Sequence, residues 1–78
     1  MTYDFAYLQD DVKLDILKMH IGSNEADLYD FQIKLSELNM ATIKDEAIIA
    51  EYEARINDKI EQNSMLNGLI TDLMNSMS

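Results

Sequence analysis

The stretch IGSNEADLYDF, residues 21–31, holds the clearest punctuation in this 78-residue sequence and decides the predicted fold. Gly22 is one of only two glycines, and glycine commonly ends a helix just after its last turn. Ser23 or Asn24 can cap a following helix, and Glu25 places negative charge in its first turn, where the helix dipole favours it. Because this join is short, the segments on either side are predicted to form an antiparallel helical hairpin.

Apolar residues on both sides of the join recur at steps of three and four, the spacing of one helix face. The pattern predicts a helix over residues 3–21, with Asp4 as a candidate N-cap, and a second helix over residues 24–39. The first face consists of Phe5, Leu8, Val12, Ile16 and Met19, widened by Leu14, Leu17 and Ile21, and the second consists of Leu28, Phe31, Leu35 and Leu38.

A second change of pattern follows around residues 40–45. Thr42 is a candidate N-cap with Asp45 at the N3 position, although the stretch also fits inside one long helix because no residue there forbids it. The apolar row of the second helix would next fall on Thr42 and Asp45, yet it begins again at Ile49. This apparent shift favours a break or a kink, and a third helix is predicted over residues 45–77.

The predicted third helix carries a long apolar stripe. A helix of this length spans about 50 Å, more than a hairpin of the first two helices can cover. A partner chain is therefore expected, giving a homodimer or a higher oligomer that completes a small helical bundle. The predicted hydrophobic interface consists of Ile49, Tyr52, Ile56, Ile60, Leu66, Ile70, Leu73 and Met77.

The closing segment QNSMLNGLITDLMNSMS, residues 62–78, contains a single charged residue, Asp72. It can be a helix buried in the protein's own bundle or in a homo-oligomer, or a docking helix whose flexible Met side chains fit another protein's groove. It can also be a frayed terminus. An amphipathic membrane anchor would carry Lys or Arg on its polar face, and none follows Lys59.

Composition indicates a single all-α domain over residues 1–78. The chain has no Pro and no Cys, 47% of its residues are hydrophobic, and its net charge is −9. That charge argues against direct binding to nucleic acid or to anionic lipid. The sequence shows neither a signal-peptide pattern nor an apolar run long enough to span a bilayer. A cytoplasmic protein is expected.

The residues that usually carry chemistry are sparse. His20 is the only histidine, and the two glycines lie too far apart for a phosphate-binding loop. Asp11 and Asp15 are close on a helix surface, but general acid–base catalysis also needs a pocket that shifts their pKa values. We therefore expect no enzyme and no catalytic, cofactor-binding or metal-binding residue.

Acidic residues of the first half form a candidate partner-binding surface. Carboxylates three or four positions apart on a helix lie about 5–6 Å from each other, a spacing that Lys and Arg side chains made for phosphates also accept. In composition the chain resembles small acidic phage proteins, such as anti-CRISPR or anti-restriction proteins that mimic nucleic acid. This resemblance implies a basic, nucleic-acid-binding host protein as the partner. The surface consists of Asp4, Asp10, Asp11, Asp15, Glu25, Asp27 and Asp30.

The stretch LQDDVKLDILKMHIGSNEADLYDF, residues 8–31, loosely resembles the opening of the small helical head–tail connector proteins of tailed phages. Those proteins also begin with a short helix, a glycine break and an acidic start to the next helix, and the resemblance implies a structural role. The leading expectation is a non-enzymatic, acidic helical protein that self-associates and presents a surface to a protein partner.

Overall fold

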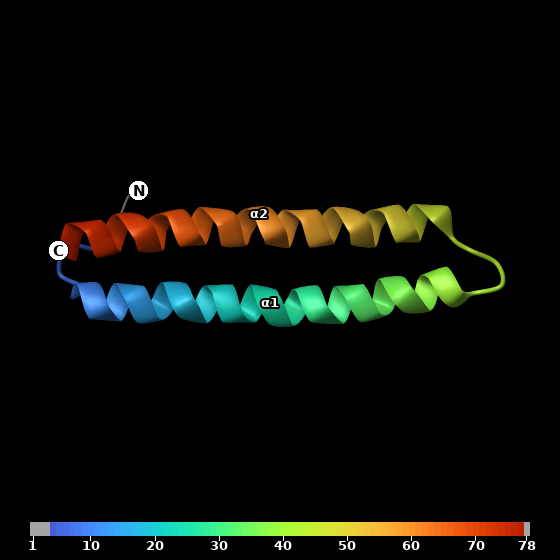
Figure 1. Cartoon of the computed structure of the whole chain (residues 1–78), viewed down its shortest axis with the longest axis horizontal. Coiled ribbons are helices and arrows are strands. Elements are labelled where there is room, and N and C mark those ends of the chain that lie inside the picture. Colours follow the sequence, from blue (N-terminus) through green and yellow to red (C-terminus); the bar gives the residue numbers. More distant parts are fainter. Residues whose placement is uncertain (1–3, 78) are drawn as a thin grey trace.

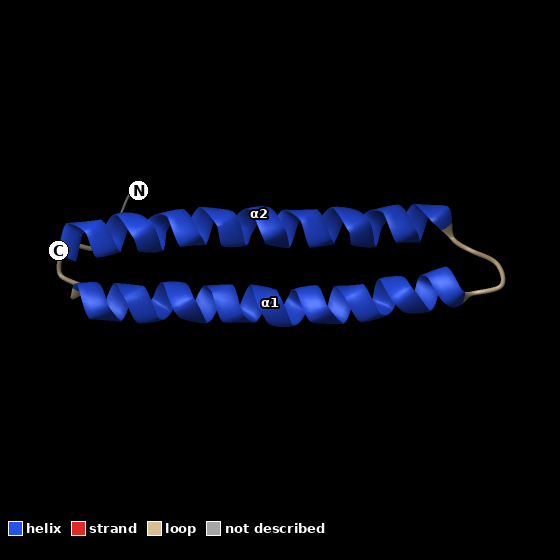
Figure 2. Cartoon of the chain, viewed as in Figure 1, coloured by secondary structure: helices blue, strands red, loops and turns tan. Residues whose placement is uncertain are grey.

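The computed structural model describes residues 4–77. Two long helices, α1 (Asp10–Met40) and α2 (Glu46–Met77), lie antiparallel and are joined by a loop of residues 41–45 (Figures 1 and 2). The described residues contain no strand, so the all-α prediction is confirmed. The hairpin is 54 Å along its longest axis. The start of α1 and the end of α2 lie at the same end of the molecule (Figure 1).

The predicted helix break at Gly22 is wrong. Helix α1 runs without interruption from Asp10 to Met40, and Gly22 does not adopt a positive φ angle. Asn24 does not cap a helix, because its side-chain amide donates a 2.8 Å hydrogen bond to Oδ1 of Asn63 on α2. Glycine inside a helix costs about 1 kcal/mol relative to alanine. The packing of the residues around Gly22 against α2 outweighs that local preference.

The first helix also begins later than predicted. Residues 4–9 precede α1, and Asp4 caps a turn there, its carboxylate accepting a 2.9 Å hydrogen bond from the backbone N–H of Ala6. The backbone N–H of Leu8 donates to the carbonyl of Phe5 at 3.0 Å in the same turn. Tyr3, where the helix was predicted to start, lies outside the described residues.

The predicted break before the last helix is confirmed, with a different cap. Asp45 rather than Thr42 is the N-cap of α2: its Oδ1 accepts a 3.2 Å hydrogen bond from the backbone N–H of Ile48. Its carbonyl accepts another from the N–H of Ile49 at 3.0 Å. Asp is among the strongest N-cap residues because its side chain satisfies a free N–H of the first turn.

The two helices meet along one seam, whose residues recur at alternating steps of three and four as in an antiparallel coiled coil. Ile49 and Leu66 are its most deeply buried apolar residues. The hydrogen bond between Asn24 and Asn63 fixes the register. With heptad spacing, that register aligns the following seam positions: Leu14 with Leu73, Leu17 with Ile70, Ile21 with Leu66, Asn24 with Asn63, Leu28 with Lys59, Phe31 with Ile56, Leu35 with Tyr52 and Leu38 with Ile49.

Helix α1 therefore runs alongside α2 and covers most of its apolar stripe. The two helices have 31 and 32 residues, so the premise that the stripe is longer than the rest of the chain can cover is wrong. Ile60 and Met77 remain 52% and 50% exposed. The closing segment is helical to Met77. The other predicted interface residues face α1: Ile49, Tyr52, Ile56, Leu66, Ile70 and Leu73.

The hairpin is elongated and exposes more surface than a compact protein of its size. Its accessible surface is 6082 Å² for a mass of 9.0 kDa, whereas a compact monomer of this mass exposes about 4,850 Å². The radius of gyration is 17.2 Å, against about 11.5 Å for a compact domain of this length. Two helices alone thus leave much of the apolar surface in contact with solvent.

Candidate functional site: interaction surfaces of the hairpin

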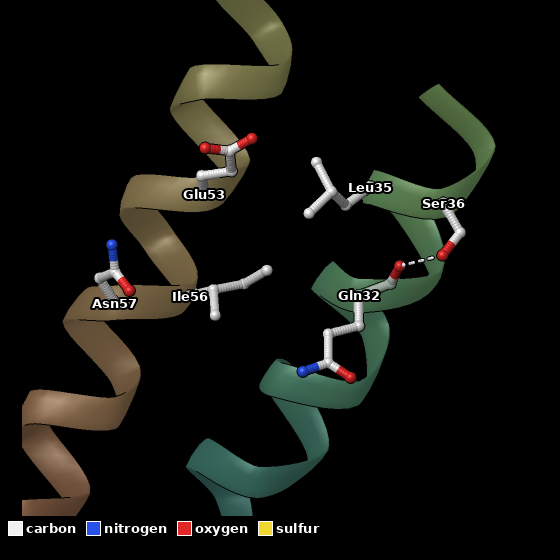
Figure 3. Close-up of a pocket in the computed structure, with 6 residues that line it drawn as sticks. All are labelled: Gln32, Leu35, Ser36, Glu53, Ile56 and Asn57. Carbon is white, nitrogen blue, oxygen red and sulfur yellow. Dashed lines mark hydrogen bonds between the residues drawn. The ribbon is translucent and has the colours of Figure 1, made fainter. Parts of the chain in front are cut away.

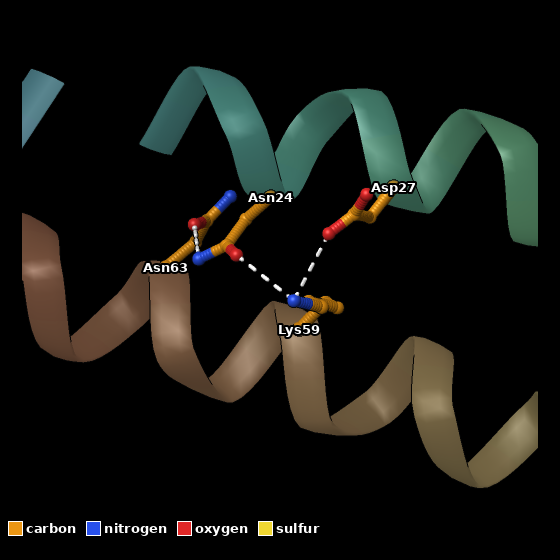
Figure 4. Close-up of polar contacts among 4 residues, drawn as sticks. All are labelled: Asn24, Asp27, Lys59 and Asn63. Atoms are coloured by element: carbon orange, nitrogen blue, oxygen red, sulfur yellow. Dashed lines mark hydrogen bonds and ion pairs between the residues drawn. The ribbon is translucent and has the colours of Figure 1, made fainter. Parts of the chain in front are cut away.

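A cluster of four polar residues, named here the polar cluster, interrupts the apolar seam near its middle (Figure 4). Asn24 is only 8% exposed and donates to Asn63, and its own Oδ1 accepts a 3.2 Å hydrogen bond from Nζ of Lys59. The same ammonium group lies 3.0 Å from Oδ2 of Asp27. The cluster thus joins two residues of each helix.

The buried polar atoms of this cluster are satisfied within the chain. Among residues 4–77, no buried side-chain nitrogen or oxygen lacks a hydrogen-bond partner. An Asn pair in a coiled-coil seam lowers stability relative to an apolar pair, but it specifies register because a shifted register leaves both amides unpaired. The polar cluster is therefore a structural element that sets the alignment of α1 on α2.

An open groove of about 470 Å³ lies between the helices in the half of the hairpin nearer the loop (Figure 3). Leu35 and Ile56 point toward each other across it. Polar side chains form its walls, and Oγ of Ser36 donates a 3.0 Å hydrogen bond to the carbonyl of Gln32. Glu53 is its only charged residue, so the groove contains no pair of titratable groups for acid–base chemistry.

Helix α1 carries a second apolar row on the side facing away from α2. In a heptad whose first and fourth positions lie in the seam, the sixth position points directly away from the partner helix. This outermost position is polar in most coiled coils. Met19 is 72% and Met40 is 85% exposed. We call this row the outer stripe; it consists of Val12, Met19, Ala26, Ile33 and Met40, with Ile16 beside it.

The outermost positions of α2 differ from those of α1. They are small or polar: Ala47, Ala54, Glu61, Gly68 and Asn75. The apolar outer row is therefore a property of α1 alone. The sequence pattern placed Val12, Ile16 and Met19 on the main face of the first helix, but the structure places them away from the seam and leaves Leu14, Leu17 and Ile21 to pack against α2.

The structure does not gather the seven acidic residues of the predicted partner-binding surface. Asp27 is engaged with Lys59, and Asp10 at the start of α1 is half-buried. Asp15 and Glu25 are exposed but lie about 15 Å apart along the helix. The acids reach from the turn at Asp4 to the middle of α1, so they form a dispersed negative surface rather than one short row.

Lys59 and Asn63 were missed by the sequence interpretation, which considered only the apolar residues of the stripe. The signal that reveals them is the unbroken heptad spacing of Ile56, Lys59, Asn63 and Leu66. Polar residues at seam positions of a coiled coil are commonly paired across the seam, and here they pair with Asn24 and Asp27.

Among residues 4–77, no group of three or more His, Cys, Asp or Glu side chains is placed to hold a metal ion. Neither described helix contains a stretch that is both long and apolar enough to cross a membrane.

Comparison with known proteins leaves the fold and the surfaces as the basis for any functional conclusion. The chain matches no protein-family model, no curated protein and no solved structure.

Proposed function

We propose that this chain is a non-enzymatic protein–protein interaction module of the cytoplasm, a helical hairpin that self-associates and presents a surface to a protein partner. The observation that carries the proposal is the outer stripe of α1. Apolar side chains at the outermost position of a coiled coil contribute nothing to the α1–α2 seam. Burying them against another chain removes them from water, at about 25 cal/mol for each Å² of apolar area.

The surface area of the hairpin supports association. Two separate hairpins of 6082 Å² each expose about 4,100 Å² more than a compact protein of twice the mass would. Stable interfaces bury a total of about 1,200–2,000 Å², and obligate ones bury more. The exposed surface is thus large enough for a stable interface with a second chain.

Introducing positive charge into the outer stripe tests the proposal. We expect Met19→Lys combined with Ile33→Lys to lower the mass measured by light scattering at about 100 µM toward that of a monomer, because two ammonium groups would then enter the interface. The helix content measured by circular dichroism should stay unchanged, since both positions are exposed and Lys is a good helix former.

The matched control is Ala47→Lys combined with Ala54→Lys, which adds the same charge at outermost positions of α2. This control should leave the association unchanged. The proposal fails if wild-type protein stays a monomer, or if the stripe variant and the control associate equally well.

A second candidate function is inhibition of a basic, nucleic-acid-binding protein, and the net charge of −9 favours it. Exposed carboxylates such as Asp15 and Glu25 would contact the basic groove. Affinity for such a partner should fall steeply between low and high salt because exposed charges are screened. Association through the outer stripe should persist or strengthen in salt, so a salt titration separates the two functions.

A further inference from the structure

The heptad pattern of α1 continues into α2 without a change of phase. Continuing the seam of α1 by steps of four and three beyond Leu38 leads to Thr42, Asp45 and then Ile49, where the seam of α2 begins. A hairpin does not require this continuity, because a loop can join the two helices in any phase. Only about one loop in seven would preserve it by chance.

The loop contains no residue that prevents a helix. Residues 41–45 are Ala, Thr, Ile, Lys and Asp, without Gly or Pro. Met40 is 85% and Ile43 is 89% exposed, so the turn buries little apolar surface. The only side-chain hydrogen bond of residues 41–45 is the N-cap of α2, in which Asp45 accepts from the backbone N–H of Ile48. Straightening the loop would replace that contact with helical backbone hydrogen bonds.

We propose that two copies of this chain exchange helices and form a straight antiparallel coiled coil, in which residues 10–77 of each chain are one continuous helix of about 100 Å. In this dimer α1 of one chain pairs with α2 of the other in the same register as in the hairpin. Asn24 of each chain pairs with Asn63 of the second copy. Every seam contact of the hairpin is therefore kept, as in domain swapping.

The exchanged dimer also gains contacts that the hairpin lacks. At its centre the register brings Thr42 of each chain opposite Asp45 of the other, so two Thr–Asp pairs face each other across the seam. A Thr hydroxyl can donate a hydrogen bond to an Asp carboxylate. These pairs are compatible with a seam position, and they leave no apolar cavity at the dyad.

Protein concentration decides between the two forms. In the hairpin α1 meets its own α2 at an effective concentration in the millimolar range, so the monomer dominates in dilute solution. Exchange requires the seam to open, which makes refolding at high concentration the most effective way to populate the dimer. This inference goes beyond the association through the outer stripe, because here a second copy is the partner and the seam is the surface that the two copies share.

Spin labels within one chain test the exchange. The chain has no Cys, so Ser23→Cys and Ser64→Cys introduce unique labelling sites at exposed positions of α1 and α2 outside the outer stripe. In the hairpin these labels lie beside each other on the two helices, about 20 Å apart. In the straight helix the same two sites lie about 60 Å apart. The labelled chain is refolded with an excess of unlabelled protein so that only distances within one chain are measured.

We expect the dimer isolated after refolding at about 1 mM to give the long distance and the monomer to give the short one. A dimer that gives only the short distance would overturn the exchange while leaving association through the outer stripe intact. A protein that remains monomeric at every concentration would overturn both.

Variants of the loop provide a second, independent measurement. Thr42→Leu with Asp45→Leu places apolar residues at the two seam positions of the loop and should lower the dimer dissociation constant at least about 10-fold. The matched control, Ile43→Leu with Lys44→Leu, adds leucines at positions outside the seam and should change it by less than about 2-fold. Equal effects of the two pairs would contradict the exchange.

Discussion

Asn24 and Asn63 determine how the two helices align. Their hydrogen bond, together with the contacts of Lys59 to Asn24 and Asp27, lies in a seam that is otherwise apolar on both sides. Apolar seam residues tolerate a shift by one heptad, since another apolar residue then fills the same place. A shift by one heptad would separate the two amides and leave them unpaired, so this one polar layer selects a single register.

Substituting Asn24 and Asn63 by leucine, singly and together, measures what their hydrogen bond contributes to the free energy of unfolding. Asn24→Leu alone should lower the free energy of unfolding by about 1–2 kcal/mol, because it deprives both Asn63 and Lys59 of a partner. Adding Asn63→Leu should restore or exceed the wild-type value by forming an apolar layer. Urea unfolding followed by circular dichroism measures both changes. A single variant as stable as wild type would show that the amide pair is not formed.

Gly22 offers a direct check on the continuity of α1. No atom lies within 4 Å of the place where a Cβ would be added, and its backbone is helical. Gly22→Ala should therefore raise the free energy of unfolding by about 0.5–1 kcal/mol. Gly68→Ala, equally open in α2, should give a similar gain. If Gly22 ended a helix in a left-handed conformation, the alanine variant would instead lose stability in thermal melts.

At the scale of the elements, the helical content and the long last helix could be predicted from the sequence, because apolar spacing and the absence of Pro carry that information. The break at Gly22 was mispredicted for a physical reason. Gly, Ser and Asn are local helix-end signals, but here Ile21 and Asn24 occupy seam positions. Long-range packing against α2 overrides the local preference for a helix end. Helix-capping signals in the sequence carry no information about that packing.

The interaction surfaces were harder to predict because they depend on which of two apolar rows of α1 faces α2. The row through Val12, Ile16 and Met19 is as regular as the row through Leu14, Leu17 and Ile21. Only the second row shares an unbroken heptad with Leu28 and the residues after it. That heptad is recognisable only once Gly22 is accepted inside the helix.

The start of α2 has a specific prediction at this scale. Asp45→Ala should lower the free energy of unfolding by about 0.5–2 kcal/mol, because it removes the side chain that caps the N–H of Ile48. Thr42→Ala should have a much smaller effect, because Asp45 already supplies the cap. Chemical denaturation of the two variants under identical conditions compares them. The reverse ranking would identify Thr42 as the cap.

At the scale of the whole molecule, the hairpin leaves more apolar surface exposed than its one seam can bury. Ile49 and Leu66 are the only apolar residues among those described that are less than one-tenth exposed. The exposed apolar surface lies on both helices and around the loop. We propose that association through the outer stripe covers part of it.

Small-angle X-ray scattering over a dilution series tests the central claim most directly, because one experiment gives both the shape and the mass. In dilute solution we expect an elongated monomer of 9.0 kDa with a radius of gyration near 17.2 Å. At rising concentration the mass should approach that of a dimer. A radius of gyration near 11.5 Å, typical of a compact bundle of this length, together with a mass that never rises, would contradict the account.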